Sequence, residues 1–227
     1  MGRCGRGGSE GAFFSPGEAE PLREAGHPRG WGRGEVLMRE GEEARFVVLL
    51  TAGLVKATVD SANGCTSLLA LRGPGELLGE LTCVDGGPRG ATVTAMRRSE
   101  GVVVAADAFL RLLERDAGLC LSVLRGVVGR LRDSDVLRAE QGARTTRARV
   151  AGLLVKLAVQ YGSAAPEILP DAVSVQVNQR ELAAATGASR ESVVRCLRAM
   201  QQEGLVATGR GRTVVLDLAG LRRWAGE

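Results

Sequence analysis

The chain of 227 residues is long enough for one large domain or two smaller ones, and with 44% hydrophobic and 25% charged residues it is predicted to be globular and cytoplasmic. No apolar run approaches the roughly 18 residues of a membrane span, so we expect no membrane segment. The net charge of +4 is uneven, because residues 144–227 carry 12 basic and 7 acidic residues whereas residues 1–143 carry 18 and 19, and a basic C-terminal third favours a polyanionic partner.

The first residues are rich in glycine and arginine and have no apolar core of a signal peptide, so a flexible leader is expected over residues 1–29. Within it, Ser15-Pro16-Gly17-Glu18 has the order of a helix start. His27, the only histidine, lies in a Gly/Pro-rich segment and is expected in a solvated loop. The five cysteines form no C-x-x-C pair, so we expect neither a metal site nor an iron–sulfur cluster.

Residues 34–104 alternate short apolar segments with turn signals. The apolar segments read RFVVLLT, LVKATV, TSLLAL, ATVTAM and GVVVA, and glycine-containing or acidic turns separate them. Regular short strands of this kind are typical of an antiparallel sandwich or roll. We therefore predict a β-rich domain over residues 30–118, which ends with the amphipathic helix ADAFLRLLERD.

A narrow apolar stripe follows. Its residues recur at spacings of 3, 4 and 3, as in the seam of a coiled coil: Leu121, Leu124, Val128 and Leu131. Such a stripe either packs a helix on its own sheet or joins two copies of the helix. The narrow width and the flanking arginines favour a dimerisation helix over residues 119–142, which Gln141-Gly142 is expected to interrupt at the domain boundary.

The last predicted domain spans residues 143–227 and begins with a helix capped by Thr145. Within it, residues 177–206 (VNQRELAAATGASRESVVRCLRAMQQEGLV) have the pattern of two short helices joined by a sharp turn. Asn178 and Glu181 form a capping box for a first helix.

This first helix is predicted over residues 179–186, and Gly187 supplies the left-handed residue that a sharp turn needs. Ser189 then caps a second helix. Ala183 is small where the two helices cross, and Val193 fills the space between them. These features predict a helix-turn-helix rather than an ordinary helical hairpin.

The start of the second helix carries the side chains that could contact base edges: Arg190, Glu191 and Arg195. Arginine can bind guanine through two hydrogen bonds and glutamate can accept from cytosine N4, so we favour base recognition over a merely solvated charged face. The segment LVATGRGRTVVLDL predicts a β-hairpin wing behind the helices. The expected contacts to the DNA backbone come from both helices and the wing: Arg180, Ser189, Ser192, Arg210 and Arg212.

The stretch GELTCVDGGPRGATV, residues 79–93, places Glu80 and Arg89 in small, apolar surroundings. Gly79-Glu80-Leu81 can begin a helical turn whose N–H groups face an anion, and a guanidinium suits a phosphate. The alternative is a salt bridge between Glu80 and Arg89 that closes a loop.

Residues 186–206 resemble the DNA-binding helices of the Crp/Fnr (catabolite activator / fumarate-nitrate regulator) family of bacterial transcription factors, and residues 79–93 resemble that family's phosphate-binding cassette. The order of segments matches from about residue 30 to about residue 218. The resemblance implies an α+β fold with a cyclic-nucleotide-binding β-roll, a long dimerisation helix and a winged helix-turn-helix. It also implies a homodimer that binds a palindromic double-stranded DNA operator with a half-site similar to TGTGA, and RNA polymerase as a further candidate partner.

In this family the arginine at Arg89 pairs with the cyclic phosphate and the glutamate at Glu80 holds the ribose 2′-hydroxyl. The resemblance therefore implies a cyclic nucleotide, cAMP or cGMP, as effector. The residues assigned to it are Gly79, Glu80, Leu81, Arg89, Gly90, Ser134 and Asp135.

Two of these positions depart from the family. The residue after the arginine is usually serine, alanine or threonine, but here it is Gly90. The pair of base-contacting hydroxyl residues falls at Ser134 and Asp135, and a carboxylate replaces the second hydroxyl. We therefore hypothesise that effector selectivity differs from that of the cyclic AMP activators.

The sequence thus predicts a homodimeric transcription regulator in which effector binding shifts the dimerisation helix and hence the two recognition helices. Two alternatives remain: a regulator that needs no effector and keeps a vestigial pocket, and a cyclic-nucleotide-binding module that acts on a protein partner. An enzyme is not expected, because the sequence shows no nucleophile with a base, no metal ligands and no Walker-type loop.

Overall fold

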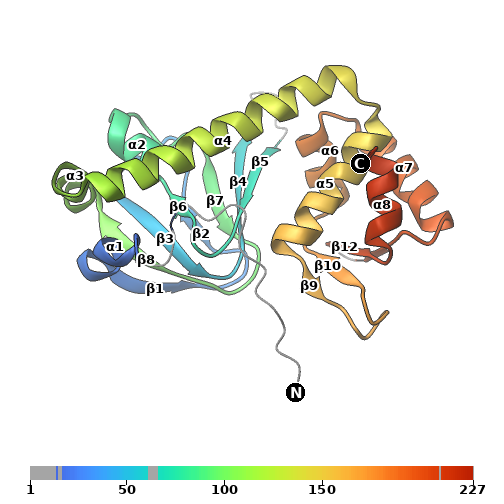
Figure 1. Cartoon of the computed structure of the whole chain (residues 1–227), viewed down its shortest axis with the longest axis horizontal. Coiled ribbons are helices and arrows are strands. Elements are labelled where there is room, and N and C mark those ends of the chain that lie inside the picture. The colour runs from blue at the N-terminus through green and yellow to red at the C-terminus, as the bar shows by residue number, and fades with distance from the viewer. Residues whose placement is uncertain (1–13, 15–16, 61–65, 210, 227) are drawn as a thin grey trace.

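The structure is a computed structural model that describes residue 14 and residues 17–60, 66–209 and 211–226, with residues 137–143 described as backbone only. It has two lobes joined by one long helix (Figure 1). The strands of the first lobe are β1 (His27–Trp31), β2 (Val36–Met38), β3 (Phe46–Ala52), β4 (Val55–Asp60), β5 (Thr66–Arg72), β6 (Leu77–Leu78), β7 (Thr92–Ala95) and β8 (Ser99–Ala105). They form two sheets in the orders β1-β8-β3-β6 and β2-β7-β4-β5, and every pairing is antiparallel. The predicted roll is confirmed.

The helices of this lobe are α1 (Glu20–Ala25), α2 (Glu80–Asp85), α3 (Ala106–Arg115) and α4 (Ala117–Ala143). They explain why β3 is apolar at successive positions. Val48 and Leu50 pack into the core between the sheets, whereas Val47 and Leu49 pack with Phe109 of α3 on the other face. A strand covered on both faces loses the polar alternation of a half-exposed strand.

The start of the chain differs from the expected leader. Residues 20–25 form α1, whose Leu22 is fully buried, and His27 begins β1 opposite Val103 of β8 instead of lying in a loop. The ordered part of the roll therefore begins before residue 30, because one buried leucine and one strand pairing hold a segment whose composition is otherwise polar. The predicted helix start at Ser15-Pro16 falls outside the described residues.

The long helix α4 packs on the roll through Leu119 and Val123, which are buried. It continues to Ala143, so Gln141-Gly142 does not interrupt it as expected. A glycine inside a helix costs only about 1 kcal/mol, which does not end a helix by itself. The break comes just afterwards, where the Thr145 side chain accepts from the Ala148 N–H and starts the next helix, as predicted.

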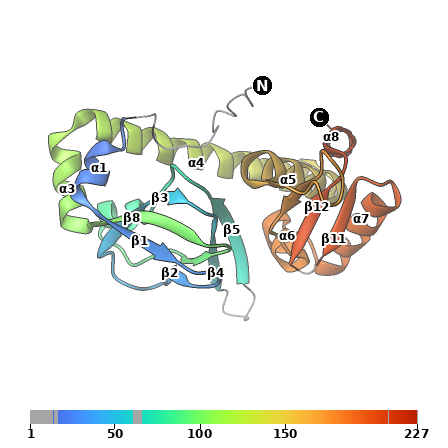
Figure 2. The same ribbon diagram turned by 90° about the horizontal axis from the view of Figure 1, so that it is seen from below.

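The second lobe contains α5 (Thr146–Tyr161), β9 (Ser163–Ala164), β10 (Val173–Val175), α6 (Gln179–Thr186), α7 (Arg190–Gln202), β11 (Val206–Gly209), β12 (Arg212–Val215) and α8 (Leu218–Ala225). Its sheet has the order β11-β12-β10-β9, and the hairpin of β11 and β12 lies beside α6 and α7 as a wing (Figure 2). No helix in the described part of the chain is both long and apolar enough to cross a membrane.

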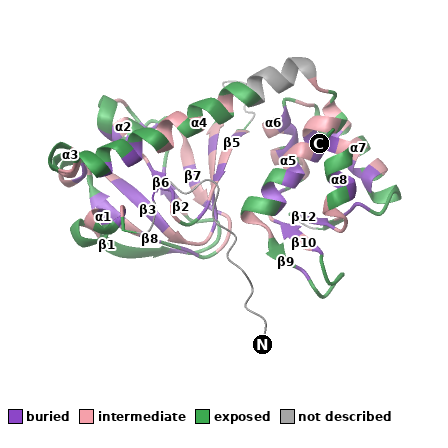
Figure 3. Ribbon diagram, viewed as in Figure 1, coloured by how far each residue is buried: buried purple, intermediate pink, exposed green. Residues whose placement is uncertain are grey.

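The cores of the two lobes meet. Leu54, Leu68 and Leu71 of the roll belong to the same buried cluster as Leu154 of α5 and Leu182 of α6. Figure 3 shows buried residues on the strands of the roll and along α5, whereas much of the outer side of α4 is exposed. The position of the second lobe is thus fixed by packing on the roll as well as by α4.

Candidate nucleic-acid interface and effector cassette

The first helix of the predicted helix-turn-helix is capped as its sequence requires. The Asn178 Oδ1 accepts from the N–H groups of Arg180 and Glu181 at 2.9 and 3.0 Å, and the Glu181 carboxylate accepts from the Asn178 N–H at 2.9 Å. This reciprocal pair satisfies N–H groups at the helix start. It confirms the capping box and the bounds of α6 as residues 179–186.

The turn between the helices is also as predicted. Gly187 has a φ of 60°, and its N–H caps the end of α6. Ser189 begins α7 through a 3.2 Å bond from the Ser192 N–H to its Oγ. Val193 is fully buried and Ala183 nearly so, as expected for residues at the point where the two helices cross. The arrangement is a helix-turn-helix, and β11 and β12 complete its wing.

The charged side chains at the N-terminal end of α7 are exposed to solvent. Arg190, Glu191 and Arg195 are all exposed, and the Arg195 Nη2 lies 2.9 Å from the Ser192 Oγ. The backbone N–H of Glu191 itself, together with the Ser189 hydroxyl, lowers the pKa of its carboxyl, so this acid is ionised at neutral pH and can accept a hydrogen bond. The stripe continues with Arg198, an exposed residue that the sequence analysis missed although its i+3 spacing from Arg195 was visible.

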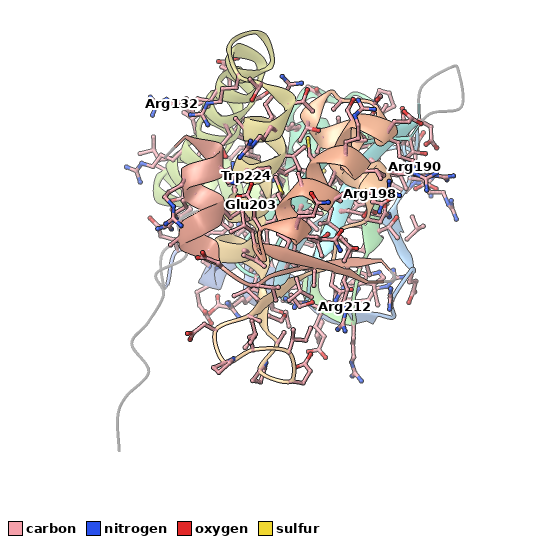
Figure 4. The ribbon with its side chains drawn as sticks, turned by 90° about the vertical axis from the view of Figure 1, so that its right-hand side faces the viewer. Arg132, Arg190, Arg198, Glu203, Arg212 and Trp224 are labelled. Carbon is pink, nitrogen blue, oxygen red and sulfur yellow. The ribbon has the colours of Figure 1, made fainter. Side chains whose placement is uncertain are left out.

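A cleft of about 320 Å³ lies between the starts of α6 and α7 and the wing. Three arginines line it: Arg180, Arg190 and Arg212. None of the described residues that line it is acidic. Arg190 and Arg212 lie on the same side of the domain (Figure 4). The structure thus joins the first helix, the recognition helix and the wing in one cationic surface, whereas Arg210 lies outside the described residues.

The cassette contains the single helix α2, and glycine is required at its start. Gly79 has a φ of +81°, and a Cβ added there would collide with the Arg89 Nη1. Only glycine adopts this conformation readily while letting a side chain approach so closely. Leu81, which was assigned to the effector, is instead 53% exposed on α2.

Arg89 is buried, with 4% of its surface exposed, but neutral groups hold it. Its Nη1 donates to the Gly79 carbonyl at 2.8 Å and to the Thr82 Oγ1 at 2.9 Å, and its Nη2 donates to the Phe46 carbonyl. The guanidinium also lies 5.2 Å from the centroid of the Phe46 ring. Within the described part of the chain, no carboxylate forms an ion pair with Arg89.

Glu80 does not pair with Arg89, so the alternative of a Glu80–Arg89 salt bridge is wrong. Its carboxylate, 2% exposed, lies 2.7 Å from the Arg130 Nη1, and the Arg130 Nη2 donates to the Leu77 carbonyl at 2.6 Å. Arg130 belongs to α4, and burial lowers its pKa while Glu80 raises it. Arg130 was not among the predicted site residues, because nothing in its local pattern distinguishes it from the other arginines of this helix.

The remaining residues assigned to the effector are Gly90, Ser134 and Asp135. Apart from its chain neighbours, a Cβ at Gly90 would meet no atom within 4 Å, so there is open space at the residue that follows Arg89. Ser134 is half-buried one helical turn after Arg130, and Asp135 is exposed. The structure thus brings Gly79 and Arg89 into direct contact and places Glu80 at the adjoining start of α2, whereas the Leu81 side chain is exposed.

Two cysteine thiols near these sites are held in their protonated form. Burial raises the pKa of the Cys83 thiol and of the Cys196 thiol, so neither is a thiolate at neutral pH. Among the described residues, no group of three or more His, Cys, Asp or Glu side chains could hold a metal ion.

A β-roll that contains a buried arginine, followed by a long helix and a winged helix-turn-helix, is the architecture of a class of DNA-binding regulators. Family models agree: residues 28–116 match the cyclic nucleotide-binding domain and residues 148–224 match the Crp-like helix-turn-helix domain. The chain is 31% identical over 187 residues to the cyclic AMP receptor protein of Thermus thermophilus, covering 82% of each chain. It is 34% identical over 199 residues to the transcriptional regulator LdrP of the same species, covering 87% of this chain and 96% of that one.

Solved structures give the same result. The crystal structure of a CRP-family transcriptional regulator from Thermus thermophilus superposes with a TM-score of 0.73 at 29% identity, over 88% of this chain and 97% of that one. The chain therefore belongs to the Crp/Fnr family and is a DNA-binding transcription regulator.

Proposed function

We propose that the chain is a homodimeric regulator whose affinity for a palindromic operator responds to a cyclic nucleotide bound at the cassette. The proposal of an effector rests on Arg89, a buried cation whose hydrogen-bond partners among the described residues are neutral oxygens. A buried charge without a counter-ion is costly, and a phosphate anion would relieve that cost. Such a regulator acts in the cytoplasm, where it would meet its operator and RNA polymerase.

On the DNA side, the first turn of α7 would enter the major groove. Arg190, Glu191 and Arg195 would contact base edges, because they are exposed at the helix end that leads into the groove. Arg180 and Arg212, which line the cationic cleft, would contact DNA phosphates beside the groove. Further contacts to the DNA backbone would come from Ser189, Ser192 and Arg210.

Dimerisation would place two such helices about 34 Å apart, as successive grooves on one face of a duplex require. The exposed seam on α4 supports this. Leu121, Leu124 and Leu131 are 50%, 55% and 58% exposed, and they occupy one stripe of a long helix. Leucines at coiled-coil spacing would be buried by a second copy of the same helix.

On the effector side, the cyclic phosphate would take the Arg89 donors now used by Gly79 and Phe46. Glu80, oriented by Arg130, would accept from the ribose 2′-hydroxyl. Ser134 and Asp135 would face the base, and the carboxylate of Asp135 favours a base edge with amino donors. We propose that this pair makes the selectivity among cAMP, cGMP and related nucleotides differ from that of the cyclic AMP activators.

One observation favours a second candidate, a regulator that needs no effector. The donors of Arg89 already have acceptors within the protein, and Gly90 lacks the hydroxyl that would help hold a phosphate. Isothermal titration of the full chain with cAMP, cGMP and a cyclic dinucleotide separates the two candidates. Micromolar binding of one of these nucleotides would support the regulator that responds to an effector. The absence of binding heat with all three would support the regulator that needs none.

The same pocket offers a gain-of-function test. Gly90→Ser places a hydroxyl in open space beside Arg89, so it should tighten nucleotide binding by several-fold, which corresponds to about 1 kcal/mol for one hydrogen bond. Gly90→Ala is the matched control, because it adds the Cβ without the hydroxyl. Equal affinities of the two variants in the titration would show that no phosphate lies next to residue 90.

Selection of bound duplexes from a random pool, with and without the nucleotides, tests the DNA half. We expect a palindrome with a half-site similar to TGTGA. Enrichment of single, non-repeated sites would contradict the dimeric arrangement.

A further inference from the structure

The two lobes are joined by a second connection, which is separate from α4. It lies between the turn that follows β5 and the last residue of α5. The Tyr161 hydroxyl donates to the Leu71 carbonyl at 3.2 Å or to the Glu76 carboxylate at 3.4 Å. Its ring lies so close to Gly73 that a Cβ there would come within 3.0 Å of it. The end of α5 is therefore fitted against the roll.

Glu76 is an uncommon residue for such a place, because only 6% of its surface is exposed. The Gly73 N–H donates to its carboxylate at 2.6 Å, and the Arg72 Nε lies 3.4 Å away. Burial raises the pKa of Glu76 and Arg72 opposes this shift. A buried carboxylate with this many partners is sensitive to the loss of any of them.

The apolar surroundings make the contact part of a larger interface. Leu54, Leu68 and Leu71 pack into the core of the second lobe. At the other edge the Lys56 Nζ lies 2.6 Å from the Glu181 carboxylate, which also completes the capping box of α6. The first helix of the helix-turn-helix, α6, is thus attached to β4 as well.

This interface adjoins the cassette directly. Glu76 precedes Leu77, whose carbonyl accepts from Arg130, and Arg130 holds Glu80. A displacement of Glu80 or Arg130 would therefore be transmitted to the residue next to Glu76 without passing along the length of α4.

We propose that the contact between Glu76 and Tyr161 is a latch that fixes the DNA-binding domain on the roll and couples its position to the cassette. The latch itself stands on the contacts of this structure, and the coupling rests on the proposed effector function. Coupling between two sites requires an element that both can displace. The latch is such an element, because Tyr161 belongs to α5 and Glu76 directly precedes β6, whose Leu77 carbonyl accepts from Arg130.

Hydrogen exchange on the full-length protein tests the latch without any effector. Tyr161→Phe removes only the hydroxyl, and Gly73→Ala places a methyl group against the ring. Both should raise amide exchange in residues 71–78 and 158–164 on the order of fivefold, as the loss of one hydrogen bond predicts. Val159→Thr is the control, because Val159 is 56% exposed on the same helix. Unchanged protection in both latch variants would overturn the proposal.

Operator binding with and without cAMP tests the coupling. In the latch variants, the ratio of the two operator dissociation constants should fall several-fold toward one, whereas Val159→Thr should keep the wild-type ratio. An unchanged ratio in a protein that responds to cAMP would overturn the regulatory role. If the wild type does not respond to cAMP, the proposed effector fails, and the exchange experiment still decides whether the latch exists.

Discussion

The helix-turn-helix and the effector cassette are both short segments built around glycines and charged side chains, yet they acquire their structure differently. In the helix-turn-helix, Asn178 bonds Glu181 and Ser189 bonds Ser192, three residues apart in each case. In the cassette, Arg89 reaches Phe46 across 43 residues and Arg130 reaches Glu80 across 50. The first site is determined by local spacing and the second by the folded roll. The following variants probe this difference.

The largest effect is expected in the cassette. Arg130→Met leaves Glu80 buried without its cation, which should lower the free energy of unfolding by about 3 kcal/mol. The double variant Arg130→Met/Glu80→Gln removes the uncompensated charge and should recover most of this loss. Urea unfolding measures both, and a single variant as stable as wild type would show that Glu80 has other partners or is neutral.

A smaller change in free energy is expected for a variant of the recognition helix α7. It should weaken operator binding and leave the stability of the fold nearly unchanged. Arg190→Ala should weaken operator binding by about 1–3 kcal/mol and relax the preference at one base pair, because an exposed arginine contributes little to folding. A gel-shift series with half-site variants measures the preference. Weaker binding with an unchanged preference would indicate that Arg190 contacts phosphates in the cleft with Arg180 and Arg212.

The contact between the lobes should show a pH dependence. Burial, with a further contribution from Glu76, raises the pKa of Tyr161 to about 12, above the value near 10 expected in the unfolded chain. The stability that this difference provides is fully present below about pH 10 and is lost as the pH rises through 12. Two pKa units correspond to at most about 2.7 kcal/mol, and because the ring is partly exposed we expect a loss of about 1–2 kcal/mol. Because Tyr161 is the only tyrosine in the sequence, its near-ultraviolet absorbance reports this titration directly. Ionisation near pH 10 in the folded protein would show that the ring is not held against the roll.

The smallest effect is expected from a local cap. Ser189→Ala removes the acceptor for the Ser192 N–H and should lower stability by about 1 kcal/mol, whereas Ser189→Gly should cost only a few tenths. Thermal unfolding of the two variants measures this difference. Equal losses would mean that the side chain contributes more through the Ser192 hydroxyl than through the cap.

Sequence by itself determined the parts of this protein whose hydrogen bonds close within a few residues. Residue types at fixed spacing determine the bounds of α6, the left-handed Gly187 and the caps at Thr145 and Ser189. Short loops have little entropy to lose on closing, so local residue preferences suffice to decide their conformation.

Tertiary structure alone decided which charged and polar groups distant in the sequence meet. Nothing in the sequence around Arg130 indicates that it neutralises Glu80, and nothing around Tyr161 indicates that it closes on Glu76. The polar composition of residues 20–29 also concealed a helix and a strand that one buried leucine and the pairing with β8 hold in place. The fold removes these polar groups from water. Each buried group must then form hydrogen bonds or ion pairs with the partners that packing brings near it.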